Sequence, residues 1–245
     1  MTDDLEFLPV SRDEMHERGW WWYDFLLITG DAYVDHPSFG TTVIARVLEA
    51  DGFRVAICAQ PDWHSAEAIT AFGRPRLGVM IGAGNLDSMV AHYTAAKKRR
   101  SEDFYSPGKR TGLRPDRATI VYANRAREAF GSEIPIVIGG LEASLRRFAH
   151  YDYWDDRVRR SVLVDSGADI LDSALMEGQS TEAAAAEAAA VMDDRELDLL
   201  DCGNAAEGLV HGVILLCVRK LGNAVELLCL KRHCRTRASY ARSRH

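Results

Sequence analysis

One stretch, residues 23–55, constrains the fold of this 245-residue chain more than any other. A short apolar run at 25–28 is followed by a loop, and residues 40–50 then carry apolar side chains at helical spacing. Asp51-Gly52 ends the helix, because glycine adopts the left-handed cap without steric cost. A second strand follows at 55–59. Such a strand–helix–strand unit closes as a right-handed parallel pair, so the first loop opens at the carboxyl edge of a sheet.

The helix at 40–50 is expected to bury one face against this sheet. The apolar side chains assigned to that face are Val43, Ile44, Val47, Leu48 and Ala50.

The alternation of strands and helices continues to about residue 171. Apolar runs predict further strands at 77–82 and 134–138 and the start of a fifth at 170–171, and residues 118–130 favour a helix. We therefore predict an α/β fold: an open, mainly parallel five-stranded sheet with helices on both faces. Residues 1–22 lead into this domain, which spans 23–171, and residues 172–245 are expected to be an irregular tail.

Charge and cysteine content separate the tail from the body. The chain has a net charge of -6, which argues against general nucleic-acid binding, but residues 1–210 carry -13 and residues 211–245 carry +7. Cys58 stands alone in the first 200 residues, and the other four cysteines follow. The body therefore resembles a protein of a reducing compartment. With an acidic N-terminus and no apolar run of about 20 residues, we expect a cytoplasmic protein without membrane contact.

Polar and glycine residues follow the predicted strands and are the candidates for the edge of a ligand cleft. They are Asp31, Asp35, His36, Asn85, Gly139, Gly140, Glu142, Ser144 and Arg146. The block after the fourth strand has a second interpretation, an ion-paired connection in which Arg146 and Arg147 bind Glu142, Asp152 or Asp155. No catalytic role and no metal site can be assigned to individual residues.

Two further segments have a functional and a structural interpretation. The polar connection at 94–117 contains Lys97 to Arg100, which could bind an anion or RNA, although a solvated helix end is favoured. Three adjacent tryptophans, Trp20 to Trp22, could stack a ligand, but covering the edge and core of the sheet is the favoured role.

Several long motifs resemble one known family. They are the P-x-x-G spacing that starts at Pro37, AQPDW at 59–63, AGNLDSMV at 83–90, RPDRATIVY at 114–122 and the segment 138–171. Over residues 7–171 the chain resembles the N-terminal region of the YgiQ-type radical SAM proteins. The resemblance implies a flavodoxin-like, cobalamin-binding-type domain ahead of a radical SAM barrel. That barrel would hold a four-iron four-sulfur cluster on C-x-x-x-C-x-x-C and cleave S-adenosylmethionine.

The chain departs from this pattern at the cluster and at the cobalamin ligand. No C-x-x-x-C-x-x-C is present, so we expect no cofactor in this chain and no radical reaction by it. Asp35-His36 precedes Gly40 with a spacing that differs from D-x-H-x-x-G, so cobalamin stays unsupported and His36 is expected to be a loop residue or a substrate contact. Because the likeness fades at Leu171, we hypothesise that the chain is truncated there and that 172–245 is a frameshifted or aberrant end.

Three functions are compatible with these observations. The first is the N-terminal domain of a YgiQ-type protein, shaping a cleft over a barrel that would be its missing partner, for an unknown substrate. The second is a stand-alone small-ligand-binding or regulatory module. The weakest is a hydrolase using His36 or His150, because G-x-S-x-G and H-E-x-x-H are absent. The sequence carries no specific nucleic-acid signal.

Overall fold

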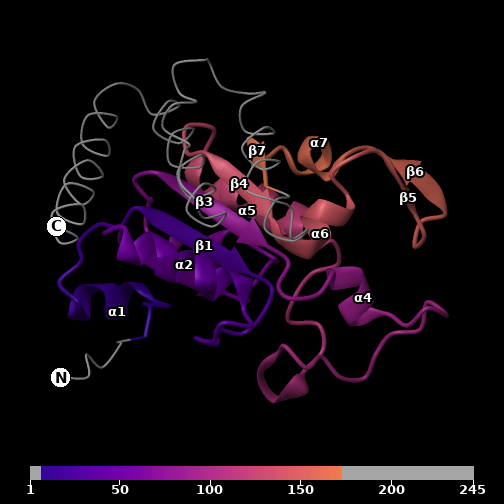
Figure 1. Cartoon of the computed structure of the whole chain (residues 1–245), viewed down its shortest axis with the longest axis horizontal. Coiled ribbons are helices and arrows are strands. Elements are labelled where there is room, and N and C mark those ends of the chain that lie inside the picture. The colour runs from indigo at the N-terminus through magenta and orange to yellow at the C-terminus, as the bar shows by residue number, and fades with distance from the viewer. Residues whose placement is uncertain (1–6, 173–245) are drawn as a thin grey trace, which may run out of the picture.

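A computed structural model describes residues 7–172, and its centre is a sheet of five parallel strands (Figure 1). The strands are β1 (Phe25–Thr29), β2 (Val55–Ala59), β3 (Gly78–Gly82), β4 (Ile136–Gly139) and β7 (Ile170–Leu171). Their order is β2-β1-β3-β4-β7, and every pair is parallel. This is the order of flavodoxin-like sheets, so the predicted fold class is confirmed.

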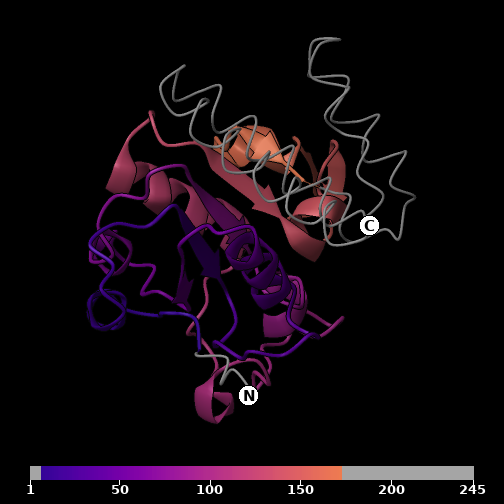
Figure 2. The same ribbon diagram turned by 60° about the vertical axis from the view of Figure 1, so that its left-hand side comes forward.

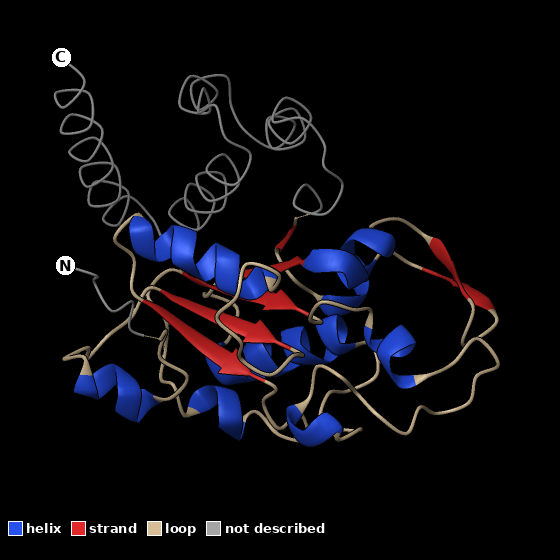
Figure 3. Ribbon diagram, turned by 60° about the horizontal axis from the view of Figure 1, so that its bottom comes forward, coloured by secondary structure: helices blue, strands red, loops and turns tan. Residues whose placement is uncertain are grey.

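The strands are apolar except for Thr29 at the end of β1, as is typical of a parallel sheet covered on both faces. Alternate side chains enter different cores: Leu26 and Ile28 face one, and Phe25 and Leu27 face the other. Helix α5 (Ala118–Phe130) packs on the first face and α2 (Gly40–Ala50) on the second. Figures 2 and 3 show helices on both sides of the sheet.

The two long helices have the predicted bounds, but the predicted buried face of α2 is partly wrong. Its fully buried residues are Thr42, Ala45 and Leu48, whereas Val43 and Ala50 are exposed. At 100° per residue, both of these positions lie about 150° from Ala45, on the solvent side.

Short elements complete the domain. They are α1 (Arg12–Glu17), α3 (Glu67–Thr70), α4 (Ser88–His92), η1 (Pro107–Lys109), α6 (Gly140–Leu145), α7 (Val162–Ser166) and the antiparallel hairpin of β5 (His150–Asp152) and β6 (Arg157–Arg159). The hairpin and α4 lie at the end of the molecule towards which the strands point (Figure 1). Residues 97–100 are not a helix end as expected, but part of a turn closed by a bridge between Tyr93 and Arg99.

The three adjacent tryptophan side chains lie in three different environments. Trp20 packs partly against the core, as predicted, and Trp22 lies between the guanidinium groups of Arg54 and Arg76, at 3.9 and 4.3 Å from its ring centroid. Trp21 is 79 % exposed, so the expectation that it covers the core is wrong.

Two further expectations concern membrane contact and the C-terminal tail. In residues 7–172, no helix combines the length and the apolar surface that crossing a bilayer requires. The irregular tail expected from residue 172 onward lies almost entirely outside the described residues.

Candidate functional site

The strand order makes the gap between the ends of β1 and β3 the expected ligand crevice, because the connections leave these strands in opposite directions. Here the two loops bind each other. The Gly30 N–H donates to the Gly82 carbonyl over 3.2 Å, and Asp31 Oδ2 accepts from the Asn85 N–H over 2.7 Å. A Cβ on Gly30 would lie 2.1 Å from the Ala83 carbonyl oxygen. The crevice is therefore closed by contacts between the residues that follow the two strands, one of them made by the Asp31 carboxylate.

A buried arginine fills the space beneath these loops. Arg114 is 1 % exposed, and its Nε and Nη2 each donate to the Asp103 carboxylate over 3.0 Å. Its Nη1 donates to the Ala83 carbonyl over 3.2 Å, and Nη2 lies 3.1 Å from Asp31 Oδ1. Two buried carboxylates thus share one guanidinium, and burial raises the pKa of Asp31 above its usual range, against the hydrogen bond from Asn85 and the charge of Arg114.

The connection at 94–117 covers the ends of β1 and β2. The Ala32 N–H donates to the Tyr105 carbonyl over 2.9 Å, and the side-chain amide of Gln60 donates to Gly30 O and Ser106 Oγ. Ser106 Oγ in turn donates to Asp103. This connection is therefore part of the domain's interior, fixed by buried polar contacts.

Glu142 organises the start of two helices. Its Oε2 accepts from the Ser88 N–H over 2.8 Å and its Oε1 from the Thr119 N–H over 3.0 Å. These are residues of the first turns of α4 and α5, where free N–H groups and the helix dipole favour a carboxylate. Since Glu142 is 1 % exposed, its carboxylate is committed to the backbone.

Arg146 binds a carboxylate that was not among its expected partners. Asp87 caps α4 by accepting from the Met89 and Val90 N–H groups, and its second oxygen is ion-paired with Arg146. Of its expected partners, Glu142 accepts from Arg146 only through the backbone carbonyl, over 3.5 Å, and Asp152 and Asp155 pair with other arginines. The parallel pairing of β3 with β4 brings the loops after these strands together, although they are 59 residues apart in sequence.

The carboxylates of the β5–β6 hairpin form ion pairs with Arg117 and Arg159, not with Arg146. Arg117, which has a left-handed backbone at the start of α5, lies 2.8 Å from Asp152 and 3.0 Å from Asp155. Arg159 contacts both acids as well. Hydrogen bonding by Arg159, with the charge of Arg117, lowers the pKa of Asp155 to about 2. The block is thus ion-paired, as the second interpretation proposed, but through other arginines.

Asp35 and His36 make their contacts away from the closed crevice and away from Glu142. Asp35 is ion-paired with Arg46 on α2, and exposed His36 accepts the Ser38 N–H at Nδ1 over 3.1 Å. The Asn85 side chain donates to the Ser38 carbonyl over 3.0 Å. Asp31 and Asn85 therefore belong to the closed crevice, whereas Asp35 and His36 do not.

The glycines and the serine after β4 surround the start of α6. Gly140 has a φ of +81°, which favours glycine, and a Cβ on Gly139 would lie 3.4 Å from the Asp172 carbonyl oxygen. Ser144 Oγ is buried with no hydrogen-bond partner within residues 7–172. Together with Glu142 and Arg146, these residues form one group.

The sequence did not single out buried His92 and its half-buried partner Asp116. His92 Nδ1 lies 2.6 Å from Asp116 Oδ1, and the Tyr93 hydroxyl donates to Asp116 Oδ2 over 2.8 Å. By contrast, the His36 and His150 rings contact local backbone groups, at Ser38 and Phe148. The contacts of His36 and His150 therefore do not support the hydrolase hypothesis.

The described residues offer no donor set for an iron–sulfur cluster. Cys58 is the one cysteine between residues 7 and 172, and burial raises the pKa of its thiol to about 12. Across the same range no three His, Cys, Asp or Glu side chains are grouped so that they could hold a metal ion. Cobalamin does not fit the crevice between β1 and β3, because the loops and Arg114 fill it.

Comparison with known proteins shows which family this chain belongs to. A family described as Radical SAM N-terminal matches residues 7–205, so the match continues past Leu171, where the resemblance was expected to fade. A UPF0313 protein of Clostridium perfringens (strain SM101) is 58 % identical over 179 residues, which are 73 % of this chain and 27 % of that protein. One of Clostridium botulinum (strain Okra) is 58 % identical over 168 residues, 69 % of this chain and 26 % of that protein. The chain thus spans about a quarter of the length of these relatives. No solved structure matches it.

Proposed function

Because the chain belongs to the Radical SAM N-terminal family and is the N-terminal domain of a YgiQ-like radical SAM protein, we propose that its carboxyl edge is a docking surface. The surface would pack against the radical SAM portion of the longer relatives and form one wall of their substrate cleft. The radical reaction would belong to that other portion.

One observation carries this proposal: the buried charged side chains at the carboxyl edge bind the domain itself. Asp31, Asp87 and Glu142 hold loops and helix starts through the contacts described above. Such groups rigidify a surface but are not available to a substrate. The edge therefore suits a wall better than a reaction centre.

Exposed apolar side chains on the same segments support the docking role. They follow β1, β3 and β4 or belong to the connection that covers the edge: Val34, Val90, Leu145 and Phe104, which are 42, 48, 61 and 73 % exposed. Apolar groups at the core of an interface supply much of its stability. The relatives contain about three quarters of their length beyond this domain, and that portion is the proposed occupant.

The iron–sulfur cluster and S-adenosylmethionine of the family would bind in the radical SAM portion of the longer relatives, not in residues 7–172. A bound cluster with S-adenosylmethionine supplies a deoxyadenosyl radical. Buried Cys58 cannot provide three thiolate ligands, so no step of that chemistry is assigned to residues 7–172. The alternative role, a stand-alone module for a small ligand, loses its expected site because the crevice is closed. A reducing compartment such as the cytoplasm suits the free Cys58 thiol.

Association in solution tests the proposal. The remaining three quarters of the Clostridium perfringens relative, produced separately, should bind this chain in titration calorimetry. Leu145→Asp and Phe104→Asp should weaken binding at least tenfold, because each would place a charge in an apolar contact. Val43→Asp is the matched control, since Val43 is exposed on the outer side of α2. Absence of binding by two folded partners, or an equal effect of Val43→Asp, would refute the docking role.

A further inference from the structure

Two segments far apart in the sequence join into one surface beside the carboxyl edge. We call residues 93–100 and 147–160 the basic–aromatic lobe. The rings of Tyr93 and Trp154 lie 5.3 Å apart, and the Tyr153 hydroxyl donates to the Ala95 carbonyl over 2.7 Å. Lys97 Nζ donates to the Trp154 carbonyl over 3.4 Å. The lobe is thus a single folded unit, which Arg117 ties to the start of α5.

The charge of the lobe is opposite to that of the body. Its two segments contain eight Lys and Arg against three Asp, a net charge of +5, in a chain whose net charge is -6. The three acids are already engaged: Asp152 and Asp155 with Arg117 and Arg159, and Asp156 with the Tyr151 hydroxyl. In contrast, Lys97, Lys98, Arg99 and Arg100 are exposed, and within the described residues none of them has a carboxylate partner. Such a concentration of unpaired cations fits a polyanion.

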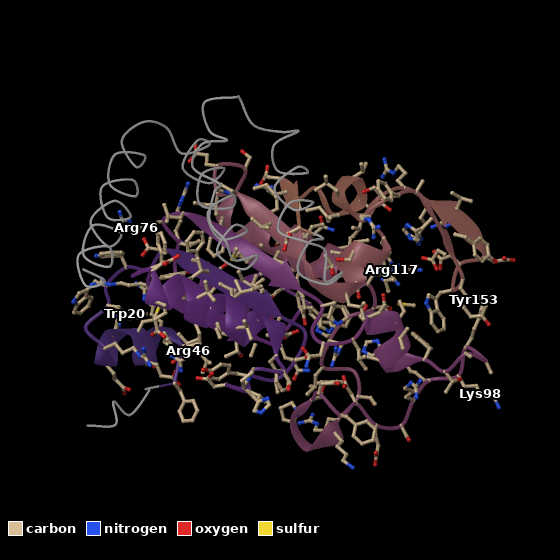
Figure 4. All side chains as sticks on the ribbon, in the orientation of Figure 1. Trp20, Arg46, Arg76, Lys98, Arg117 and Tyr153 are labelled. Carbon is tan, nitrogen blue, oxygen red and sulfur yellow. The ribbon has the colours of Figure 1, made fainter. Side chains whose placement is uncertain are left out.

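Exposed rings lie among these cations. Phe148, Tyr151 and Tyr153 are 68, 60 and 49 % exposed. Lys97 Nζ lies 4.7 Å from the Tyr153 ring centroid, and Arg147 Cζ lies 5.1 Å from that of Phe148. Figure 4 shows Lys98 and Tyr153 on the same side of the molecule, opposite Trp20 and Arg76. Rings can stack on bases while neighbouring cations contact phosphates, which is how proteins bind single strands.

We propose that the basic–aromatic lobe binds single-stranded nucleic acid. Four cations without carboxylate partners supply the phosphate contacts, and the exposed faces of Phe148, Tyr151 and Tyr153 supply stacking. An acidic protein surface would satisfy the cations but gives no use to the rings, and a duplex keeps its base faces covered. The inference goes beyond the proposed docking role and does not depend on it.

Fluorescence anisotropy with the full 245-residue chain tests this directly. The probes are fluorescein-labelled 12-nucleotide RNA, DNA of the same sequence, and the DNA duplex, each titrated between 50 and 300 mM NaCl. Single strands should bind more tightly than the duplex. Lys98→Ala combined with Arg99→Ala should reduce the slope of log K against log salt by about 1.4, because each lost phosphate contact contributes about 0.7.

A ring variant separates stacking from charge. Tyr151→Ala should weaken single-strand binding about five- to 100-fold and leave the salt slope unchanged. Lys109→Ala combined with Arg110→Ala removes two exposed cations outside the lobe and is the matched control, with no change expected. The basic residues 211–245 remain in every variant, so differences between variants report the lobe. Unchanged circular dichroism spectra would confirm that the variants are folded.

Four results would overturn the proposal. One is the absence of single-strand binding at 50 mM NaCl. Another is equal binding by the lobe variants and their control. The third is displacement of RNA by polyglutamate together with no effect of Tyr151→Ala, which would identify an acidic protein surface as the partner. Crosslinking with 4-thiouridine RNA should map to residues 147–154, and crosslinks confined to 211–245 would also overturn it.

Discussion

The guanidinium of Arg114 donates two parallel hydrogen bonds to the carboxylate of Asp103, both over 3.0 Å, in a part of the domain from which water is excluded. The same guanidinium lies 3.1 Å from Asp31. A cation is therefore required here by the two acids, and its removal would leave them without a counter-charge in the interior.

Arg114→Met should destabilise the domain by about 3–5 kcal/mol, because breaking a buried ion pair leaves an uncompensated charge. Urea unfolding at pH 7 measures this. Arg114→Lys should show an intermediate loss, since an ammonium group cannot reproduce the two parallel bonds. Exposed Arg110→Ala, on the same connection, should stay within about 0.5 kcal/mol of the parent. A similarly small effect of Arg114→Met would contradict the assigned role.

Glu142→Ala should cost roughly 3 kcal/mol, because two charge-assisted hydrogen bonds to the helix starts are lost. Glu142→Gln keeps one acceptor oxygen and should cost about half as much. In Glu142→Ala the Ser88 and Thr119 amides should be the first to exchange hydrogen faster than in the parent. If those amides exchange at the parent's rate in Glu142→Ala, the capping role is wrong.

Gly30→Ala should prevent stable folding or cost several kcal/mol, because its Cβ would meet the Ala83 carbonyl at 2.1 Å. Gly40→Ala is the matched control, since a Cβ there has nothing within 4 Å and Gly40 begins α2. It should be neutral or stabilise by up to about 1 kcal/mol. Thermal unfolding of both variants decides whether the contact between the two loops is as tight as described.

Asp155 makes the stability of the domain sensitive to acid. Its folded pKa is lowered to about 2, so its contribution is fully present above the unfolded value of about 3.9 and is lost as the pH falls through about 2. The difference in unfolding free energy between the parent and Asp155→Asn should therefore be constant from pH 5 to 7 and shrink towards zero between pH 4 and 2. A difference independent of pH over that range would rule out the ion pairs as its source.

Cys58 should resist alkylation in the folded chain. Burial raises its pKa to about 12, so almost no thiolate forms at pH 8 and the sulfur is shielded. Peptide-level mass spectrometry after iodoacetamide treatment should find Cys58 unmodified under native conditions and fully modified in guanidinium. Rapid native labelling would mean that the thiol is accessible.

The sheet could be predicted from the sequence because its strands are continuous apolar runs. β1 to β4 and the helices α2 and α5 follow from local hydrophobic patterns, which depend only on neighbouring residues. Helices α4 and α6 have five and six residues and lack such a pattern. Contacts from distant segments, such as Glu142 with Ser88, stabilise α4, and no local rule reveals them.

The sequence predicts which candidate residues follow the strands, but not which side chains they contact. The residues that follow β1, β3 and β4 do gather at the carboxyl edge, as parallel strands require. Arg114 was not among the candidates, because arginine is rarely buried and it lies in a polar stretch. The pairing of Arg146 with Asp87 depends on which loops the sheet order makes neighbours, and the sequence alone leaves that order open.

The bond between Glu142 and Ser88 also sets an order of events during folding. A five-residue helix such as α4 is unstable by itself, because nucleation is unfavourable and few bonds follow it. Asp87 caps it locally, but its first N–H, at Ser88, is bound by Glu142, a residue 54 positions further along the chain that follows β4. This contact can form only once residue 142, which follows β4, has been synthesised. A nascent chain that has not yet released β4 from the ribosome therefore lacks the contact that joins the loops after β3 and β4.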